Sequence, residues 1–210
     1  ITGLPFFSGL VVLALVTIQS FPHWIFGLSL TTDVGLALLV AGLVAAFIVG
    51  IFSNRLAGLF VFLLCLCLVS GSLLLSQPSG HIMMVALATI IAASDSAAYF
   101  IGRRVCGPKL WPRVSPNKTI SGCVGGLVAA IAVTSLVASI FGIVDLLDAL
   151  IMGLLIGGLS QAGDLMESAV KRRLDVKDSG SILPGHGGVL DRFDGYIFVI
   201  PAVYLYIFGF

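Results

Sequence analysis

Residues able to bind a metal-complexed polyphosphate are concentrated between Ser168 and Asp194. Carboxylates bind Mg²⁺ through oxygen, while Lys and Arg neutralise the charge of phosphate groups. Glycines on either side of His186 let the backbone approach a ligand closely. The residues of this stretch that we expect to contribute are Lys171, Arg172, Lys177, Asp178, His186, Gly187, Gly188, Asp191, Arg192 and Asp194.

Two aspartates of this stretch, Asp191 and Asp194, have the spacing of a metal site. They lie three residues apart, so one helical turn would present both to the same cation. A solvated loop that only sets membrane topology would need neither these acids nor the His-Gly-Gly sequence. We therefore expect a binding site here.

A second polar segment, Ser115-Pro-Asn-Lys118-Thr119, precedes a glycine-rich helix start. Its hydroxyls, its lysine and the amides of a helix N-terminus suit a phosphate group, so Ser115, Lys118 and Thr119 are candidate substrate ligands. However, Ser-Pro is also a common helix-starting turn, and a loop lysine is often only solvated or topological. The residues alone leave the two interpretations equal.

The composition of the chain excludes a soluble globular domain. Of its 210 residues, 59% are hydrophobic and 10% are charged, whereas soluble domains have roughly 45–50% and 25%. The apolar residues gather into runs near the ~20 residues needed to cross a bilayer. We therefore expect an all-α polytopic membrane protein that forms a single domain over residues 1–210. The net charge of +1 gives no reason to expect a nucleic-acid partner.

Seven runs are candidate membrane spans: 5–21, 34–52, 56–76, 82–102, 122–144, 149–166 and 195–210. With these spans, three loops on one side of the membrane hold all 11 Lys and Arg residues. By the positive-inside rule these loops and the N-terminus are cytoplasmic, and the C-terminus is outside. The N-terminus shows no recognisable signal peptide, and the four cysteines, which form no CxxC pair, are expected to be free thiols.

Two carboxylates, Asp95 and Asp164, fall inside predicted spans, where an ionisable group is costly and is a functional candidate. Asp95 and Tyr99 share one helical face. Ser160, Asp164, Glu167 and Lys171 likewise follow helical spacing. The alternative to a functional role is a hydrogen-bond network between helices. Gly153 and Gly157 continue the face of Ser160 and Asp164 deeper into the predicted span, and for these two glycines we expect only a role in close helix packing.

The stretch from Ser168 to Asp194 resembles the signature of the phosphatidate cytidylyltransferases, or CDP-diacylglycerol synthases, across its whole length. Three upstream motifs are similar to the same family in the same order. They are Asp95/Ala98-Tyr99/Gly102-Arg103, then Ser115-Pro116 with Lys118-Thr119, then Gly163-Asp164-Leu165. The resemblance covers about residues 82–200. Ser121 departs from it, because members of the family often carry Glu or Gln at that position.

The resemblance implies an integral membrane enzyme of phospholipid biosynthesis that condenses CTP with phosphatidic acid, giving CDP-diacylglycerol and pyrophosphate. It implies a requirement for Mg²⁺, held by Asp164, Asp191 and Asp194, and it leaves room for a monovalent cation such as K⁺ and for a homodimer. Lys171, Arg172, Lys177 and Asp178 would lie near the metal. The expected location is a bacterial inner membrane, with the active site facing the cytoplasm.

The expected mechanism is direct in-line transfer, because the attacking phosphate is already an anion and needs no strong base. The basic residues would contact phosphate, and Asp95, Tyr99 and His186 would contribute to substrate binding. Four alternatives remain at this point. They are a CTP-dependent polyprenol or phytol kinase, a transferase acting on an ether-lipid phosphate, an ion-coupled transporter, and a purely structural membrane subunit, which would leave the clustered acids unexplained.

Overall fold

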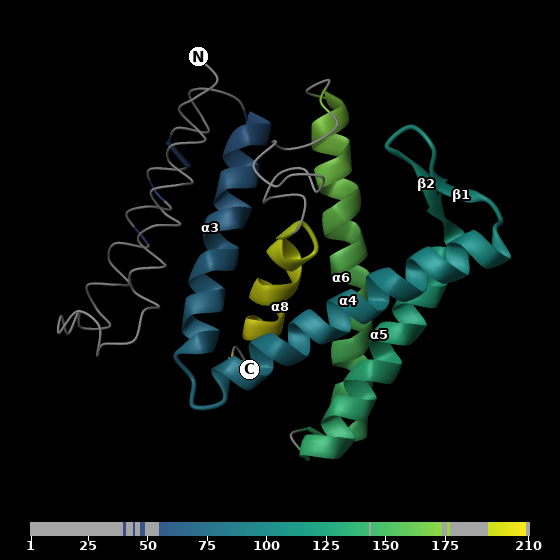
Figure 1. The fold of residues 1–210 in the computed structure, drawn as a ribbon. Coiled ribbons are helices and arrows are strands. Elements are labelled where there is room, and N and C mark those ends of the chain that lie inside the picture. Colours follow the sequence, from purple (N-terminus) through teal and green to yellow (C-terminus); the bar gives the residue numbers. More distant parts are fainter. Residues whose placement is uncertain are drawn as a thin grey trace, which may run out of the picture. The chain divides into compact units, whose positions relative to one another are not determined.

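The computed structural model describes residues 55–142, 144–173, 176 and 193–208, together with residues 40, 44, 47 and 48. The chain divides into two compact units, Ile1–Gly80 and His81–Phe210. The first unit contains helix α3, Arg55–Leu75. The second contains α4 (Gly80–Val105), β1 (Lys109–Trp111), β2 (Ser115–Thr119), α5 (Ile120–Phe141), α6 (Leu146–Arg173) and α8 (Tyr196–Phe208) (Figure 1).

Each described helix coincides with one of the predicted apolar runs. Three of them, α4, α5 and α6, are long and apolar enough to cross a membrane, whereas α8 is a shorter apolar helix. The predicted span 5–21 lies outside the described residues, and the four described residues of the span 34–52 are helical. The structure is thus that of a mostly helical membrane protein, and the total of seven spans stays a prediction.

Helix α6 continues well beyond the apolar run predicted at 149–166, because its polar end carries stabilising side-chain pairs. Lys171 Nζ lies 2.9 Å from Glu167 Oε2, four residues earlier on the same helix. Its last turn also carries Lys171, Arg172 and Arg173, whose positive charges are favourable at a helix C-terminus. The chemistry predicted for a loop after residue 166 therefore begins on a rigid helix.

The all-α prediction is wrong for the segment between α4 and α5, which forms a two-stranded antiparallel hairpin. Lys109 pairs with Thr119 and Trp111 with Ser115. A short turn joins the strands, with the Val114 N–H donating to the Trp111 carbonyl at 3.1 Å. Proline at positions 112 and 116 lacks an N–H and disfavours a helix here, so the backbone groups of this segment pair across the hairpin instead.

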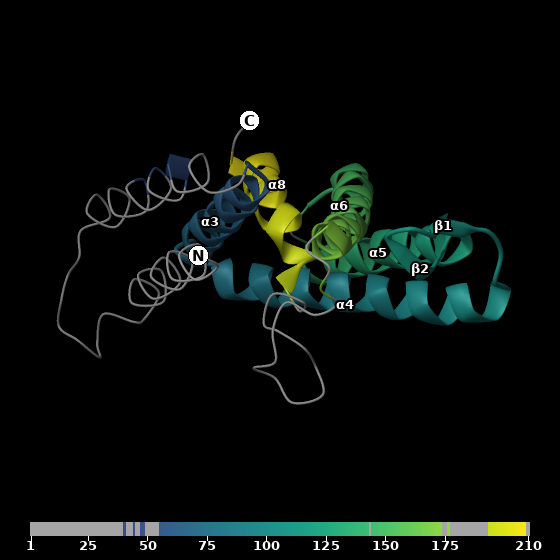
Figure 2. The same ribbon diagram turned by 90° about the horizontal axis from the view of Figure 1, so that it is seen from above.

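Small residues allow α5 to pack closely on its neighbours, as is typical of membrane helices. Every fourth residue of one α5 face is small and buried: Gly122, Gly126, Ala130, Thr134 and Ala138. Large apolar side chains such as those of Val124, Val128, Leu136 and Ile140 are exposed instead, as expected for a surface that faces lipid. Helix α6 packs along α5, and α8 packs against α6 (Figure 2).

The packing role predicted for Gly153 and Gly157 is confirmed. A Cβ on Gly153 would lie 2.6 Å from the Ile131 Cα, and one on Gly157 would lie 2.8 Å from the Ala130 Cβ. Both distances are shorter than real Cβ contacts, so α6 can lie this close to α5 only because glycine stands at these positions.

Gly122→Ala is expected to destabilise the protein, because α4 and α5 touch at this residue. A Cβ on Gly122 would lie 2.6 Å from the Ala98 carbonyl oxygen and 3.2 Å from the Gly102 Cα, both backbone atoms. Overpacking of this kind typically costs about 1–3 kcal/mol. Thermal unfolding of the purified protein in detergent measures the effect.

The matched control is Gly158→Ala on α6, where a Cβ would meet nothing within 4 Å. Helical alanine is favoured over glycine by roughly 0.5–1 kcal/mol, so this variant should unfold at the same temperature or slightly higher. Equal destabilisation by the two substitutions would contradict the close contact of α4 with α5.

Candidate active site

The polar face of α6 carries the first part of the site, as its spacing predicted. The Ser168 hydroxyl donates to Asp164 Oδ1 at 3.4 Å, one turn along the helix. Glu167 is buried, with 3% of its side chain exposed, and accepts from Lys171 at 2.9 Å. A buried carboxylate needs such partners, since burying a charge without one is costly. The cytoplasm-facing end predicted for α6 thus presents a fixed set of acids and a base.

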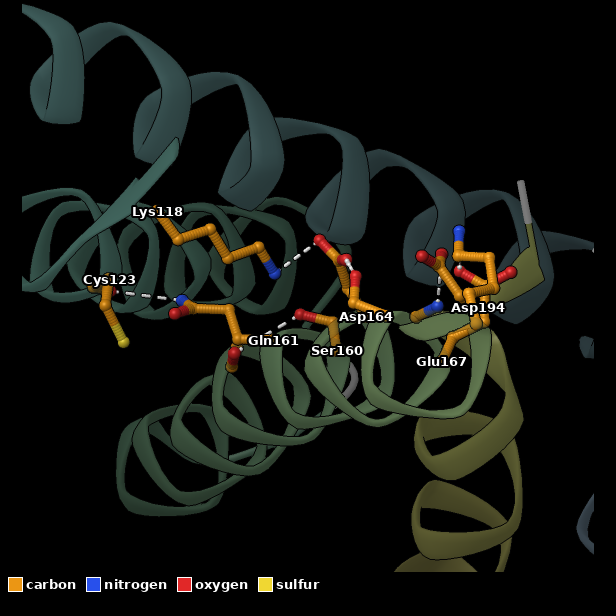
Figure 3. Close-up of polar contacts among 11 residues, drawn as sticks. Lys118, Cys123, Ser160, Gln161, Asp164, Glu167 and Asp194 are labelled. Carbon is orange, nitrogen blue, oxygen red and sulfur yellow. Dashed lines mark hydrogen bonds and ion pairs between the residues drawn. The ribbon is translucent and has the colours of Figure 1, made fainter. Parts of the chain in front are cut away.

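Lys118 of β2 joins this face through an ion pair with Asp164 Oδ2 (Figure 3). The two side chains are 27% and 37% exposed, so the pair lies partly open to solvent. The residue after Lys118, Thr119, caps the N-terminus of α5 and so fixes the end of β2 at the start of that helix. The Thr119 hydroxyl oxygen accepts from the Gly122 N–H at 3.1 Å. The structure therefore brings together two residues predicted from separate motifs.

Asp194 approaches the same face from the turn before α8. A Cβ on Gly163 would lie 2.4 Å from the Asp194 carbonyl oxygen, so glycine at 163 permits this close approach. The Gly195 N–H donates to Asp194 Oδ1 at 2.7 Å. Burial and the negative charge of Asp164 raise the pKa of Asp194, whereas hydrogen bonds from Gly195 and Glu167 and the charge of Lys118 oppose this rise.

Asp95 of α4 belongs to the same electrostatic cluster. The charges of Asp164 and Asp194 act on its carboxylate, and the Lys118 ammonium offsets them. We call Asp95, Lys118, Asp164 and Asp194 the charged cluster. Its four members come from α4, β2, α6 and the turn before α8, which the sequence separates by up to 99 positions. Three carboxylates with one lysine leave a net negative site that favours a further cation.

Other predicted ligands have local partners. Tyr99 is exposed and its hydroxyl accepts from Arg103 at 2.9 Å. Ser115 lies opposite Trp111 in the hairpin, and the Thr119 hydroxyl caps α5. Arg172 is exposed in the last turn of α6. For all four, contact with a substrate stays a prediction. The predicted residues Lys177, Asp178, His186, Gly187, Gly188, Asp191 and Arg192 lie outside the described residues.

The donor set of the charged cluster fits Mg²⁺. Asp164 and Asp194 supply the carboxylate oxygens that this hard cation prefers. Among the residues that the structure describes, no group of three metal-binding side chains meets at one point. The third predicted ligand, Asp191, precedes Asp194 by three positions and lies outside that part of the chain. Asp164 and Asp194 are the described residues that would hold the metal.

Gln161 is a residue of the site that the sequence analysis missed. Its side chain is buried between α5 and α6, and its Nε2 donates to the Cys123 carbonyl at 3.1 Å (Figure 3). Space for the amide exists because residue 126 is glycine. A Cβ added at this position would lie only 2.9 Å from the Gln161 nitrogen. Gln161 precedes Asp164 by one helical turn, and Cys123 lies in the first turn of α5. This bond therefore ties α6 to α5, the helix that directly follows the strand carrying Lys118.

Gln161→Leu is expected to lower turnover about tenfold. Its melting temperature should fall no further than that of the control variant described below. Leucine fills similar space but cannot donate to Cys123, so α5 is free to shift and Lys118 loses its alignment with Asp164. A misplacement of about 1 Å can cost up to 10²-fold in rate. Steady-state kinetics should place the loss in kcat more than in KM.

Thr134→Val is the matched control, because Thr134 is a buried polar residue of α5 whose hydroxyl bonds within its own helix, to Ala130 at 2.8 Å. Loss of this bond leaves the α5–α6 link intact. Equal losses of kcat in the two variants would show that Gln161 acts only through general stability.

Comparison with known proteins gives one family for the whole chain. The model of a family described as the cytidylyltransferase family matches residues 2–210. A phosphatidate cytidylyltransferase of Bacillus subtilis (strain 168) is 49% identical over 120 residues, which are 55% of this chain and 43% of the relative. One of Brucella suis biovar 1 (strain 1330) is 50% identical over 133 residues, 63% and 48% of the two chains.

A third relative, the phosphatidate cytidylyltransferase of Staphylococcus saprophyticus subsp. saprophyticus, is 48% identical over 118 residues, 54% of this chain and 44% of the relative. The matched region thus spans about half the length of these curated relatives. The family match, in contrast, includes every element that contributes to the charged cluster. The chain belongs to the cytidylyltransferase family.

Proposed function

We propose that this chain transfers the cytidylyl group of CTP to phosphatidic acid, giving CDP-diacylglycerol and pyrophosphate. The observation that carries the proposal is the charged cluster, in which Lys118 pairs with Asp164 at the polar end of α6. Helices α4, α5 and α6 are able to hold this cluster in a bilayer, where a lipid substrate resides. Relatives that share this region carry the name phosphatidate cytidylyltransferase.

The reaction requires one bond to form and one to break at the α-phosphorus of CTP. A phosphate oxygen of phosphatidic acid attacks this phosphorus, and the bond to the oxygen that bridges to the β-phosphate breaks. Pyrophosphate leaves with that electron pair. The attacking oxygen already carries negative charge, so no side chain must remove a proton first. The protein must position two anionic groups and neutralise their charge.

Lys118 and Lys171 are suited to neutralise phosphate charge, because each ammonium lies beside a carboxylate that fixes its position. Asp164 and Asp194 would hold Mg²⁺ together with Asp191. When bound there, the metal would screen the negative charge of the phosphates and of the departing pyrophosphate. Arg172, Lys177 and Arg192 would add positive charge around the same groups.

Access to the cluster differs for the two substrates. The acyl chains of phosphatidic acid would remain in the bilayer, and the lipid would reach the cluster from the side. CTP would arrive from the cytoplasm, on the side that the segregation of Lys and Arg identifies by the positive-inside rule. This orientation, in a bacterial inner membrane, is part of the proposal.

The position of the transferred phosphorus tests the proposal against the kinase alternative. Purified protein receives phosphatidic acid, or a polyprenol in a parallel reaction, with CTP labelled with ³²P at either the α- or the γ-phosphate. We expect lipid-soluble label from α-labelled CTP and phosphatidic acid only. Lipid-soluble label from γ-labelled CTP would instead show transfer of the terminal phosphate, as in a polyprenol or phytol kinase.

A further inference from the structure

The segment from Arg103 to Thr119, which we call the basic hairpin, has a pronounced charge imbalance. It contains five Lys or Arg residues, and the sequence from residue 103 to residue 121 includes neither Asp nor Glu. Four of these cations are exposed: Arg103, Arg104, Lys109 and Arg113. The fifth, Lys118, pairs with Asp164. The basic hairpin thus presents positive charge that its own sequence does not neutralise.

The exposed cations also lack acidic partners elsewhere in the described part of the chain. The ion pairs found there are those of Lys118 with Asp164 and of Lys171 with Glu167. Arg103 donates to Tyr99, whose hydroxyl is neutral. Lys171, at the end of α6, is by contrast held by a carboxylate. Four exposed and unneutralised cations within one short segment are suited to an anionic partner outside the protein.

The position of the basic hairpin limits what this partner can be. It begins in the last turn of α4 and ends at Thr119, directly before the first residue of α5, and both helices are candidate membrane spans (Figure 1). With α4 and α5 as membrane spans, the chain would leave the membrane near Arg103 and return near Ile120, and both ends of the basic hairpin would then be held at the membrane boundary. The surface that lies beside it there is the layer of lipid headgroups.

Apolar side chains on the basic hairpin match this location. Trp111 is 50% exposed and Val105 is 67% exposed. Along β1, Lys109 and Trp111 are exposed while Leu110 between them is partly covered. Tryptophan is enriched at the membrane interface, where its ring lies at the level of the headgroups. A purely topological signal would account for the cations but not for an exposed tryptophan beside them.

We propose that the basic hairpin binds the headgroups of anionic lipids in the surrounding bilayer, with Trp111 lying at headgroup depth. The shared chemistry is a phosphate or phosphodiester charge, and the lipid layer is the source to which we commit. This inference does not depend on the proposed transferase activity. If the transferase activity is also correct, lipid binding by the basic hairpin would raise the local concentration of anionic lipid next to Lys118, the member of the charged cluster that β2 carries.

Fluorescence of Trp111 tests the proposal without any turnover. The chain has two tryptophans, so Trp24→Phe makes Trp111 the only one. This protein is placed in nanodiscs that contain equal fractions of dibrominated phosphatidylglycerol or dibrominated phosphatidylcholine, each bromolipid diluted in ordinary lipid. Bromine quenches a tryptophan only on close contact. We expect the anionic bromolipid to quench Trp111 several-fold more efficiently.

Substitutions identify the charges responsible. A cation near an anionic surface contributes about fivefold to lipid affinity, so Lys109→Gln with Arg113→Gln should abolish most of the preference. The exchange Lys109→Arg with Arg113→Lys keeps both charges and should retain it. Arg173→Gln, the matched control, removes one exposed cation from the end of α6 and should leave the preference unchanged.

Three results would overturn the proposal. One is equal quenching by the two bromolipids in the parent protein. A second is a loss of preference in Arg173→Gln as large as in the hairpin variant, which would indicate only a general charge effect. The third is loss of the preference on addition of millimolar CTP when sodium chloride of the same ionic strength leaves the preference intact. That result would show that the basic hairpin binds nucleotide phosphate.

Discussion

Asp164→Asn is expected to leave a folded protein in the membrane and to lower kcat by about 10²–10³, the usual cost of losing one group that stabilises developing charge. Asparagine keeps the shape of the side chain but removes the negative charge that holds Lys118. It also removes one of the two described carboxylates able to bind Mg²⁺. Steady-state assays of cytidylyl transfer at several Mg²⁺ concentrations measure the loss and any raised metal requirement.

Asp148→Asn provides the matched control, because Asp148 lies in the first turn of the same helix, at the end away from the charged cluster. Its Oδ1 accepts from the Tyr206 hydroxyl at 2.8 Å, and an asparagine oxygen can accept the same bond. This variant should retain near wild-type activity. Equal reductions of kcat by the two substitutions would contradict the assignment of Asp164 to the active site.

Lys118→Gln is expected to reduce kcat/KM about 10²-fold and, in addition, to tighten the binding of a divalent cation when no nucleotide is present. If Lys118 contacted phosphate alone, its loss would barely change the Mg²⁺ requirement, because an ammonium group cannot bind a metal ion. The ion pair changes this expectation, because the Lys118 ammonium and a metal ion would compete for the Asp164 carboxylate. Titration with Mn²⁺, followed by electron paramagnetic resonance, measures the affinity directly.

A double-mutant cycle shows whether the two residues act as a pair. In Lys118→Gln with Asp164→Asn, the loss of kcat/KM should be much smaller than the product of the two single losses, because contacting residues are not additive. Lys118→Arg keeps the charge and should preserve the weaker Mn²⁺ binding. An unchanged Mn²⁺ affinity in Lys118→Gln would mean that the amine and the metal do not share Asp164.

The sequence predicted the helices well because their signals are local. Apolar runs bounded by polar residues located α3, α4, α5, α6 and α8, and helical spacing placed Asp164, Glu167 and Lys171 on one face. The hairpin was missed because its strands are short and its pairing depends on backbone bonds between β1 and β2. The periodicity of side chains carries little information about such a segment.

Residue types and positions were enough to predict which charged residues belong to the site. They did not predict which of these residues contact one another. Intramembrane position identified Asp95 and Asp164 as candidates, but only the packing of α5 on α6 brings Lys118 onto Asp164. Gln161 carries no charge and belongs to no motif that we recognised. Its importance depends on the Cys123 carbonyl, which lies 38 positions away along the chain.

The most direct test of the central claim follows both products of the reaction in one experiment. The purified chain is placed in nanodiscs with phosphatidic acid, CTP and Mg²⁺, and pyrophosphate and CDP-diacylglycerol are measured over time. The account predicts that both appear at a ratio of about one for wild type and for Asp148→Asn, and that both nearly vanish for Asp164→Asn. Formation of liponucleotide by Asp164→Asn at the wild-type rate, or pyrophosphate release without liponucleotide, would contradict it.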